Sequence, residues 1–179
     1  MNTVQPIRSK RDIERMKKAL RGRDLLLFIF GINSALRISD ILALNVGDVR
    51  GKESVTLREK KTGKAKRFPL NQSIQNAIKL LVPADASDDA PLFPSRKGTG
   101  AITRVQAYRI LNDAAERSGI NVEMGTHSLR KTFAFHAYKA GVDISVLMTV
   151  LNHSSQRETL RYIGVVQDDI DNVYINVNL

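Results

Sequence analysis

The sequence contains no cysteine among its 179 residues. This excludes a disulfide framework, a thiol nucleophile and a cysteine-based zinc site. Long apolar runs are also missing, because the longest, LLLFIFGI at residues 25–32, is far too short to span a bilayer, and no small-residue cleavage site follows it. Internal repeats and low-complexity tracts are absent as well. These absences favour one globular domain in a reducing cytoplasm.

Positive charge is concentrated in two segments. The chain has 28 Lys and Arg against 18 Asp and Glu, which gives a formal net charge of +10. Residues 1–23 and residues 50–67 each hold eight basic and two acidic side chains, whereas the other 138 residues carry a net charge of −2. Two local basic segments on a nearly neutral body favour a polyanionic partner, because each neutralised phosphate releases counterions. Charge alone does not distinguish this from ordinary solvated surface charge.

Apolar periodicity predicts an α+β fold that is mostly α-helical and has a small antiparallel sheet. From Val46 the spacing becomes that of a strand, with a turn at residues 61–64 and renewed alternation through Phe68 and Leu70. Elsewhere the apolar positions recur at helical spacing. We expect helices near residues 9–22, 25–36, 39–44, 72–81 and 103–118, and three short ones between residues 126 and 165.

A stretch in the C-terminal third combines these short helices with histidine, arginine and tyrosine. Thr126 is expected to cap a helix, which places His127 and Arg130 one turn apart on the same face. The exposed amide N–H groups of a helix N-terminus favour an anion, so this end has the outline of a phosphate site. His153 follows the second short helix, and Tyr162 lies about two turns into the third.

Five motifs occur in order along the chain. They are SALRISDILAL around Arg37, KKTGKAKRFPL at the hairpin, THSLRKTFA with His127 and Arg130, LNHSS with His153, and TLRYIG around Tyr162. Each motif alone is a weak signal, whereas their order and spacing together are specific. From about residue 24 to residue 165, the sequence resembles the catalytic domain of the tyrosine recombinases, the phage integrase family. The resemblance implies that family's fold and its cleavage and rejoining of DNA strands.

The chemistry of attack on a phosphodiester requires these residue types. The five-coordinate phosphorus carries extra negative charge on its nonbridging oxygens, and the sequence shows no evident metal site. Arg37 and Arg130 stay charged at any working pH, and their planar guanidinium groups match phosphate oxygens. At about 4 Å a pair of unit charges is worth roughly 4 kcal/mol at an effective dielectric of about 20, so losing either arginine should slow the reaction by orders of magnitude. His127 and His153 would add hydrogen bonds, and one of them could accept the tyrosine proton.

The resemblance implies a role for each residue. Tyr162 would be the nucleophile, which forms a 3′-phosphotyrosyl intermediate and keeps the energy of the broken bond. His127 would be the general base. Lys61 would be the general acid that protonates the leaving 5′-hydroxyl, with Lys60 and Lys64 as alternatives in the same turn. No metal and no cofactor are expected.

The sequence departs from the family pattern at two places. Asp40 stands where the family usually has glutamate, and we expect it to orient Arg37 through a water molecule. The second departure is the missing N-terminal DNA-binding domain, so the chain is expected to be a fragment or a single-domain recombinase. We divide it into a basic arm at residues 1–23, a catalytic domain at 24–165 and a tail at 166–179.

Duplex DNA is the expected partner, and no membrane partner is expected. The residues predicted to contact DNA are Lys60, Lys64, Lys66, Arg67, Lys10, Arg11, Lys17 and Lys18. Recombination needs four strand exchanges, so the resemblance implies several protomers on paired sites and a tetramer in the synapse. The apolar tail at residues 173–179 is expected to be a strand or a segment that docks on a neighbouring protomer.

Three other functions remain open. A type IB topoisomerase uses the same chemistry as a monomer, and a non-catalytic DNA-binding regulator would retain only the fold. A metal-dependent nuclease is the least favoured, because no carboxylate pair lies near the basic cluster. Tyr174 is the alternative nucleophile, although it lies 21 residues after His153 in an apolar segment without a basic neighbour.

Overall fold

The computed structural model describes residues 4–58, 63, 65–125, 127–164 and 174–177. This part of the chain is mostly helical, with one two-stranded antiparallel sheet among its elements. None of its helices is long and apolar enough to cross a membrane. The elements are α1 (Lys10–Ala19), α2 (Gly22–Ser34), α3 (Ile38–Ile41), α4 (Val46–Val49), β1 (Ser54–Arg58), β2 (Ala65–Pro69), α5 (Gln72–Leu81), α6 (Arg104–Arg117), α7 (Ser128–Lys139), α8 (Ile144–Leu151) and α9 (Gln156–Ile163).

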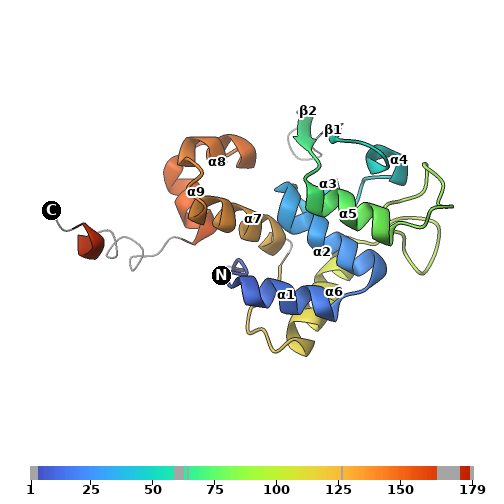
Figure 1. Cartoon of the computed structure of the whole chain (residues 1–179), viewed down its shortest axis with the longest axis horizontal. Helices are drawn as coiled ribbons and strands as arrows, with labels where there is room; N and C mark the ends of the chain where they lie inside the picture. The colour runs from blue at the N-terminus through green and yellow to red at the C-terminus, as the bar shows by residue number, and fades with distance from the viewer. Residues whose placement is uncertain (1–3, 59–62, 64, 126, 165–173, 178–179) are drawn as a thin grey trace.

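Helix α2 forms the centre of the fold because its sequence is apolar on nearly every face (Figure 1). Leu27, Phe28 and Phe30 are fully buried, and α5 and α7 both pack against the helix. Gly31 lets α7 approach closely, since a Cβ atom at this position would lie 3.0 Å from the Cβ of Leu129. The close packing brings the first turn of α7 next to the C-terminal end of α2.

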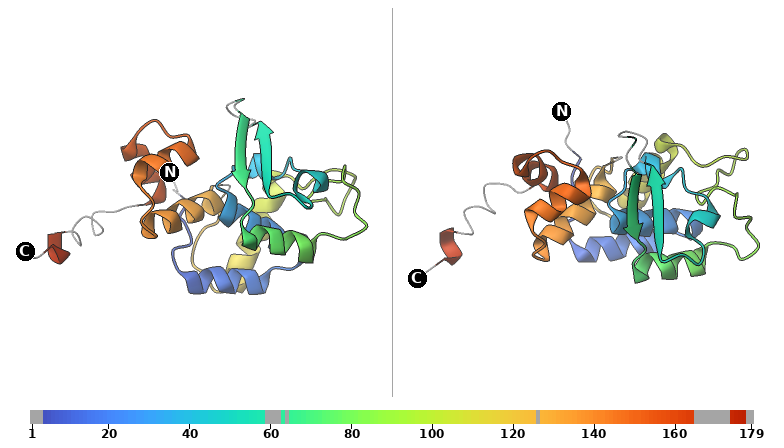
Figure 2. Two further views of the ribbon diagram at one scale, coloured as in Figure 1. Left: turned by 45° about the horizontal axis from the view of Figure 1, so that its top comes forward. Right: turned by 90° about the horizontal axis from the view of Figure 1, so that it is seen from above.

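Strands β1 and β2 form the predicted hairpin, in which Val55 pairs with Phe68. Phe68 anchors the sheet to the core through an edge-to-face contact with Phe30, with ring centroids 6.1 Å apart. The hairpin extends away from α2 on the side that also carries α8 (Figures 1 and 2). The buried side chains of Val55 and Phe68 therefore determine which face of the hairpin packs on the core.

Helices α7, α8 and α9 build a second, smaller core. Ala134, Leu151 and Ile163 are fully buried there, one from each helix. Ser155 begins α9 as predicted, because its Oγ accepts a hydrogen bond from the backbone N–H of Glu158 at 3.1 Å. This cap fixes which residues of α9 face the other two helices.

The N-terminal helix α1 belongs to the main core. Ser9 caps it by accepting a hydrogen bond from the backbone N–H of Asp12, and Ile7, Met16 and Leu20 are buried in the same cluster as α2. The figures place α1 on the side of α2 away from the hairpin (Figures 1 and 2). The two basic segments that contain α1 and the hairpin therefore lie on different sides of the molecule.

Two predicted elements differ in the structure. Residues 46–49 form the short helix α4 rather than the beginning of a strand, because Asn45 and Asp48 make a reciprocal capping box. Residues 174–176 form a helical turn rather than a strand, and the side chains of Tyr174 and Ile175 are exposed.

Candidate active site

Arg37 is positioned by the way in which α2 ends. The helix stops at Ala35, whose φ of +54° lies in the left-handed region, and the chain then enters α3 with Arg37 at its N-cap. A residue with a Cβ is strained in this region, so the surrounding structure must hold it there. Asp40 is 3% exposed and its backbone N–H donates to the Arg37 carbonyl at 2.9 Å. Arg37 thus lies in a turn that backbone hydrogen bonds fix.

Arg130 joins the two cores of the protein. Its side chain is 3% exposed. Nη1 donates to the carbonyl oxygen of Ala35 at 2.6 Å, and Nη2 donates to the carbonyl oxygen of Leu151 at 2.5 Å. Neutral carbonyl groups satisfy these donors but do not cancel the charge of the guanidinium. The site therefore contains a fixed cation beside the turn that carries Arg37.

Tyr162 lies on α9 close to two histidine rings. Its ring centroid is 4.9 Å from that of His153 and 6.4 Å from that of His127, both in edge-to-face geometry. Its hydroxyl is shielded from solvent and makes no hydrogen bond of ordinary geometry within the part of the chain described. Burial raises the pKa of Tyr162 to about 12, against the opposing effects of Arg130 and Arg37. Five of the six predicted catalytic residues therefore meet here.

The ring of His153 is oriented by α9. Its Nδ1 lies 3.0 Å from Oγ1 of Thr159. The Thr159 hydroxyl also contacts the carbonyl of Ser155 at 3.3 Å, so the first turn of α9 fixes the orientation of the imidazole. Burial lowers the pKa of His153, Glu158 opposes this effect, and Arg130 adds to it. The imidazole is therefore mostly neutral at pH 7 and can accept a proton.

The first turn of α7 carries His127, as the sequence predicts, and the N-cap of this helix is His127 itself. Thr126 lies outside the described residues, and His127 itself occupies the N-cap position without a side-chain hydrogen bond to the helix. One turn separates the exposed His127 from the buried Arg130. The ring of His127 therefore contributes to the surroundings of Tyr162 rather than to the helix cap.

Lys131 completes the cluster, although our reading of the sequence did not select it. The residue is 6% exposed, and its Nζ lies 5.2 Å from the centroid of the Tyr162 ring. Nζ also donates to the carbonyl oxygen of Val4 at 2.9 Å. Burial lowers the pKa of Lys131. In the sequence, its position directly after Arg130 is the signal that points to this lysine. The contact with Val4 could not be predicted, because the two residues are 127 positions apart.

The hairpin places one of its basic residues at the edge of this cluster. Lys66 on β2 donates from Nζ to the carbonyl oxygen of Val150 in α8 at 2.7 Å. Arg67 points to the other face of the hairpin, where its Nε donates to Oγ of Ser54 at 3.2 Å. Three predicted lysines of the hairpin tip lie outside the described residues: Lys60, Lys61 and Lys64.

The basic residues of α1 lie apart from the site. Those predicted to bind DNA are Lys10, Arg11, Lys17 and Lys18. Lys17 forms an ion pair with Glu14, with an Nζ to Oε1 distance of 2.7 Å. Helix α1 and the hairpin lie on different sides of α2 (Figures 1 and 2). Contact between α1 and DNA stays a prediction.

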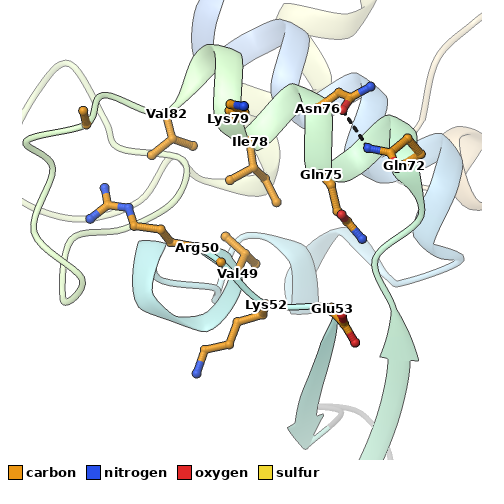
Figure 3. A pocket seen from close by; sticks show the side chains of 12 residues that line it. Val49, Arg50, Lys52, Glu53, Gln72, Gln75, Asn76, Ile78, Lys79 and Val82 are labelled. Carbon is orange, nitrogen blue, oxygen red and sulfur yellow. Dashed lines mark hydrogen bonds between the residues drawn. The ribbon is translucent and has the colours of Figure 1, made fainter.

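A separate cavity of about 640 Å³ lies between α4 and α5 (Figure 3). Arg50, Glu53 and Lys79 are among its lining residues, but none of the predicted catalytic residues is. Within the described ranges, no group of three or more His, Asp or Glu residues is placed to hold a metal ion. Arg37 and Arg130 are cations whose guanidinium groups suit a phosphate.

Comparison with known sequences identifies close relatives of the chain. Residues 9–168 match the sequence profile described as the Phage integrase family. The probable integrase/recombinase YoeC of Bacillus subtilis is 46% identical over 171 residues, which cover 94% of this chain and 93% of that protein. The tyrosine recombinase XerD of Caulobacter vibrioides is 32% identical over 148 residues, 78% of this chain and 48% of that protein. The chain thus spans nearly all of the first relative and about half of the second.

Solved structures share the fold. A XerA recombinase matches with a TM-score of 0.79 and 20% identity, over 98% of this chain and 65% of that one. The catalytic domain of bacteriophage HP1 integrase matches with a TM-score of 0.62 and 24% identity, over 96% and 95% of the two chains. A lambda integrase dimer bound to a COC′ core site gives a TM-score of 0.70 at 14% identity, over 91% and 49%. The α+β fold class predicted from the sequence is confirmed.

Proposed function

Because the chain belongs to the phage integrase family, we propose that it is a site-specific recombinase that cleaves and rejoins duplex DNA through Tyr162. The observation that carries this proposal is the position of the Tyr162 hydroxyl. It is buried close to two histidine rings, beside the guanidinium of Arg130 and in the field of Arg37. A tyrosine with only a packing role has no need of two arginines at its hydroxyl.

In the proposed reaction, the Tyr162 oxygen attacks the phosphorus of one DNA strand. A bond forms between that oxygen and the phosphorus, the bond to the 5′-oxygen breaks, and the 5′-hydroxyl leaves. The phenol proton passes to a base, for which the neutral ring of His153 and the ring of His127 are both placed. The phosphotyrosyl ester retains the energy of the broken bond, so a 5′-hydroxyl can reverse the step without ATP.

Arg37 and Arg130 would stabilise the charge that develops on the nonbridging oxygens. Their guanidinium groups come from different parts of the chain and meet at Tyr162. Arg130 is fixed in place before substrate binds, by its two carbonyl partners. Such preorganisation is the main source of electrostatic catalysis, because no group has to reorient as the charge appears.

We propose that a lysine of the hairpin protonates the leaving 5′-hydroxyl. Lys61 is the candidate that the family resemblance selects, with Lys60 and Lys64 beside it in sequence. The contact between Lys66 and Val150 supports this proposal, because it holds β2 against α8 at the edge of the site. Asp40 would orient the neighbouring Arg37.

The partner of this reaction would be duplex DNA, bound by several protomers on paired sites. One structural relative is a lambda integrase dimer bound to its core site. By analogy, we assign residues 24–165 to the catalytic unit, residues 1–23 to a basic arm and residues 166–179 to a tail that docks on a neighbouring protomer. The tail exposes Tyr174, Ile175 and Val177, which suits such docking. The protein would act in the cytoplasm, where its DNA substrate lies.

A nicked suicide substrate tests the proposal. The DNA is first selected for binding from a random pool, and a nick next to the scissile phosphate then lets the 5′-hydroxyl fragment diffuse away. We expect a covalent adduct between protein and DNA on a denaturing gel, and ligation when a new 5′-hydroxyl strand is supplied. Relaxation of supercoiled plasmids without a selected site would instead indicate a topoisomerase.

Two tyrosine variants provide the control. Tyr162→Phe should form no adduct and keep its affinity for DNA, whereas Tyr174→Phe should form the adduct at the wild-type rate. If neither the wild type nor Tyr174→Phe forms an adduct on DNA that both bind, the protein is a binding protein that retains the fold. Inhibition of cleavage by EDTA would favour a metal-dependent nuclease.

A further inference from the structure

A cation over the face of the Tyr162 ring belongs to none of the predicted catalytic residues. Among the contacts in the described structure, Nζ of Lys131 lies 5.2 Å from the ring centroid. An ammonium group at this distance from an aromatic face is attracted by the ring quadrupole. The attraction increases when negative charge enters the ring, as it does when a phenol becomes a phenolate. Lys131 is therefore placed to act on Tyr162 itself, while Arg37 and Arg130 lie near its hydroxyl.

The position of Lys131 is fixed rather than adopted by chance. The residue is 6% exposed, and a buried ammonium group needs hydrogen-bond acceptors. The carbonyl oxygen of Val4 provides one, 2.9 Å from Nζ. Val4 is itself packed on Gly125, where an added Cβ would lie 3.1 Å from the Cβ of Val4. The small residue before α7 thus leaves room for the segment that holds Lys131.

Further hydrogen bonds hold this N-terminal segment, residues 4–8, against α7 and α9. The backbone N–H of Ile7 donates to Oγ1 of Thr132 at 2.9 Å. Nη2 of Arg8 donates at 2.7 Å to the carbonyl oxygen of Gly164, the C-cap of α9. Gly164 follows Tyr162 by two residues. The same segment therefore supports Lys131 on one side and the end of the nucleophile's helix on the other.

We propose that Lys131 is a positioning residue for Tyr162: held by the Val4 carbonyl, its ammonium group orients the ring close to the two histidines and stabilises the negative charge that the ring gains during attack. This inference rests on the proposed recombinase function. It gives the N-terminal segment a role at the active site, in place of a role limited to DNA contact. Within the residues that the structure describes, Arg37, Arg130, His127 and His153 are the other charged or titratable groups that act on Tyr162 or contact its ring.

The effect of the positive charge of Lys131 can be separated from the effect of its hydrogen bond to the Val4 carbonyl. Lys131→Gln keeps a donor for the Val4 carbonyl but removes the charge, whereas Lys131→Arg keeps both. Lys139→Met is a matched control, because Lys139 lies on the same helix and its Nζ is 5.9 Å from the ring of Phe135. The three variants therefore test the charge at Tyr162 and not the loss of any lysine from α7.

The experiment measures the rate of adduct formation on the nicked substrate between pH 6 and pH 10, with DNA affinity and thermal stability measured in parallel. At pH 7 we expect Lys131→Gln to be roughly 3- to 30-fold slower, with unchanged affinity. Lys131→Arg should recover most of the rate and Lys139→Met should match the wild type. Burial lowers the pKa of Lys131, so its ammonium group loses its proton at a lower pH than an exposed lysine does. The wild type should therefore lose its rate advantage over Lys131→Gln as the pH rises.

Equal rates for folded Lys131→Gln and the wild type would overturn the inference and leave the recombinase function standing. A deficit of the same size at every pH, not recovered by Lys131→Arg, would also overturn it, because a structural defect behaves in this way. If Lys131→Gln does not fold, Lys131→Met, an apolar substitution suited to a buried position, is judged by the same rates. A wild type that forms no adduct would contradict the function and the inference together.

Discussion

Arg130 donates a hydrogen bond from Nη1 to the carbonyl oxygen of Ala35 at 2.6 Å, across 95 positions of the chain. Ala35 ends α2 two residues before Arg37, so this bond connects the turn that carries one arginine to the side chain of the other. The second bond of Arg130, to Leu151, connects the same group to the end of α8, two residues before His153. One buried guanidinium thus sets the relative positions of three segments of the site.

Arg130→Lys should therefore damage both stability and catalysis. A lysine carries the charge but lacks the planar fork, so it cannot reach both carbonyl groups in the same geometry. We expect a loss of about 1–3 kcal/mol in the free energy of unfolding, from a carbonyl left without its donor. Adduct formation should fall by at least about 100-fold. Urea denaturation and the suicide substrate measure the two effects, and a variant that retains both wild-type values would refute this role of Arg130.

Ala35→Gly should stabilise the protein. Ala35 has a φ of +54°, which glycine adopts without the steric cost that a Cβ imposes. The larger entropy of glycine in the unfolded state opposes folding and offsets part of this relief, so the expected net gain is about 0.5–1 kcal/mol. Ala137→Gly in the last turn of α7 is the control and should be destabilising by up to about 1 kcal/mol. Denaturation by urea measures both, and destabilisation of similar size in the two variants would contradict the left-handed conformation of Ala35.

Gly31→Ala should destabilise the contact between α2 and α7. A Cβ at this position would lie 3.0 Å from the Cβ of Leu129, so the Leu129 side chain must move and the two helices are pushed apart by a few tenths of an ångström where it cannot. Overpacking of this kind costs about 1–3 kcal/mol. Adduct formation should fall as well, because the shift separates Arg130 from Ala35. Gly100→Ala is the matched control, since nothing lies within 4 Å of its added Cβ. The measurement is the denaturation midpoint, and equal midpoints for the two variants would rule out the close approach.

His153 should make the protein less stable in acid. Its pKa in the folded protein is lowered, chiefly by burial, below the value of about 6.5 expected in the unfolded chain. The unfolded chain therefore takes up a proton first as the pH falls, and stability that is present above about pH 6.5 is lost as the pH drops through the folded pKa. His153→Gln removes this contribution. We expect its melting temperature to fall less than that of the wild type between pH 7.5 and pH 5, and a parallel fall would contradict the lowered pKa.

Much of the fold followed from local patterns in the sequence. The helix predicted at residues 72–81 has those bounds in the structure, where Ile74 and Ile78 give it a buried face and Asn71 caps it. Helix α4 was missed because its four residues are too few for a helical period, and its capping box uses Asn45 and Asp48 instead of the more familiar serine and glutamate. Short elements depend on their caps more than on their apolar pattern.

The residues of the site could be predicted where the order and spacing of the sequence motifs selected them. Arg37, Arg130 and Tyr162 were selected by motifs, and the structure brings them together. Lys131 was not selected, because a lysine in a helix is usually solvated and its acceptor on Val4 comes from a contact across 127 residues. The sequence also could not show that α1 and the hairpin lie on different sides of the molecule, because the net charge of a segment does not tell which way the folded segment faces.

The most direct test is to identify the amino acid that carries DNA in the covalent adduct. Adduct formed on the selected suicide substrate is digested with nuclease and protease, and the peptides are sequenced by mass spectrometry. We predict a nucleotide linked to Tyr162, in the peptide that contains Thr159 and Leu160, and no modification elsewhere. A nucleotide on Tyr174 or on any other residue, or an adduct that persists in Tyr162→Phe, would contradict Tyr162 as the nucleophile.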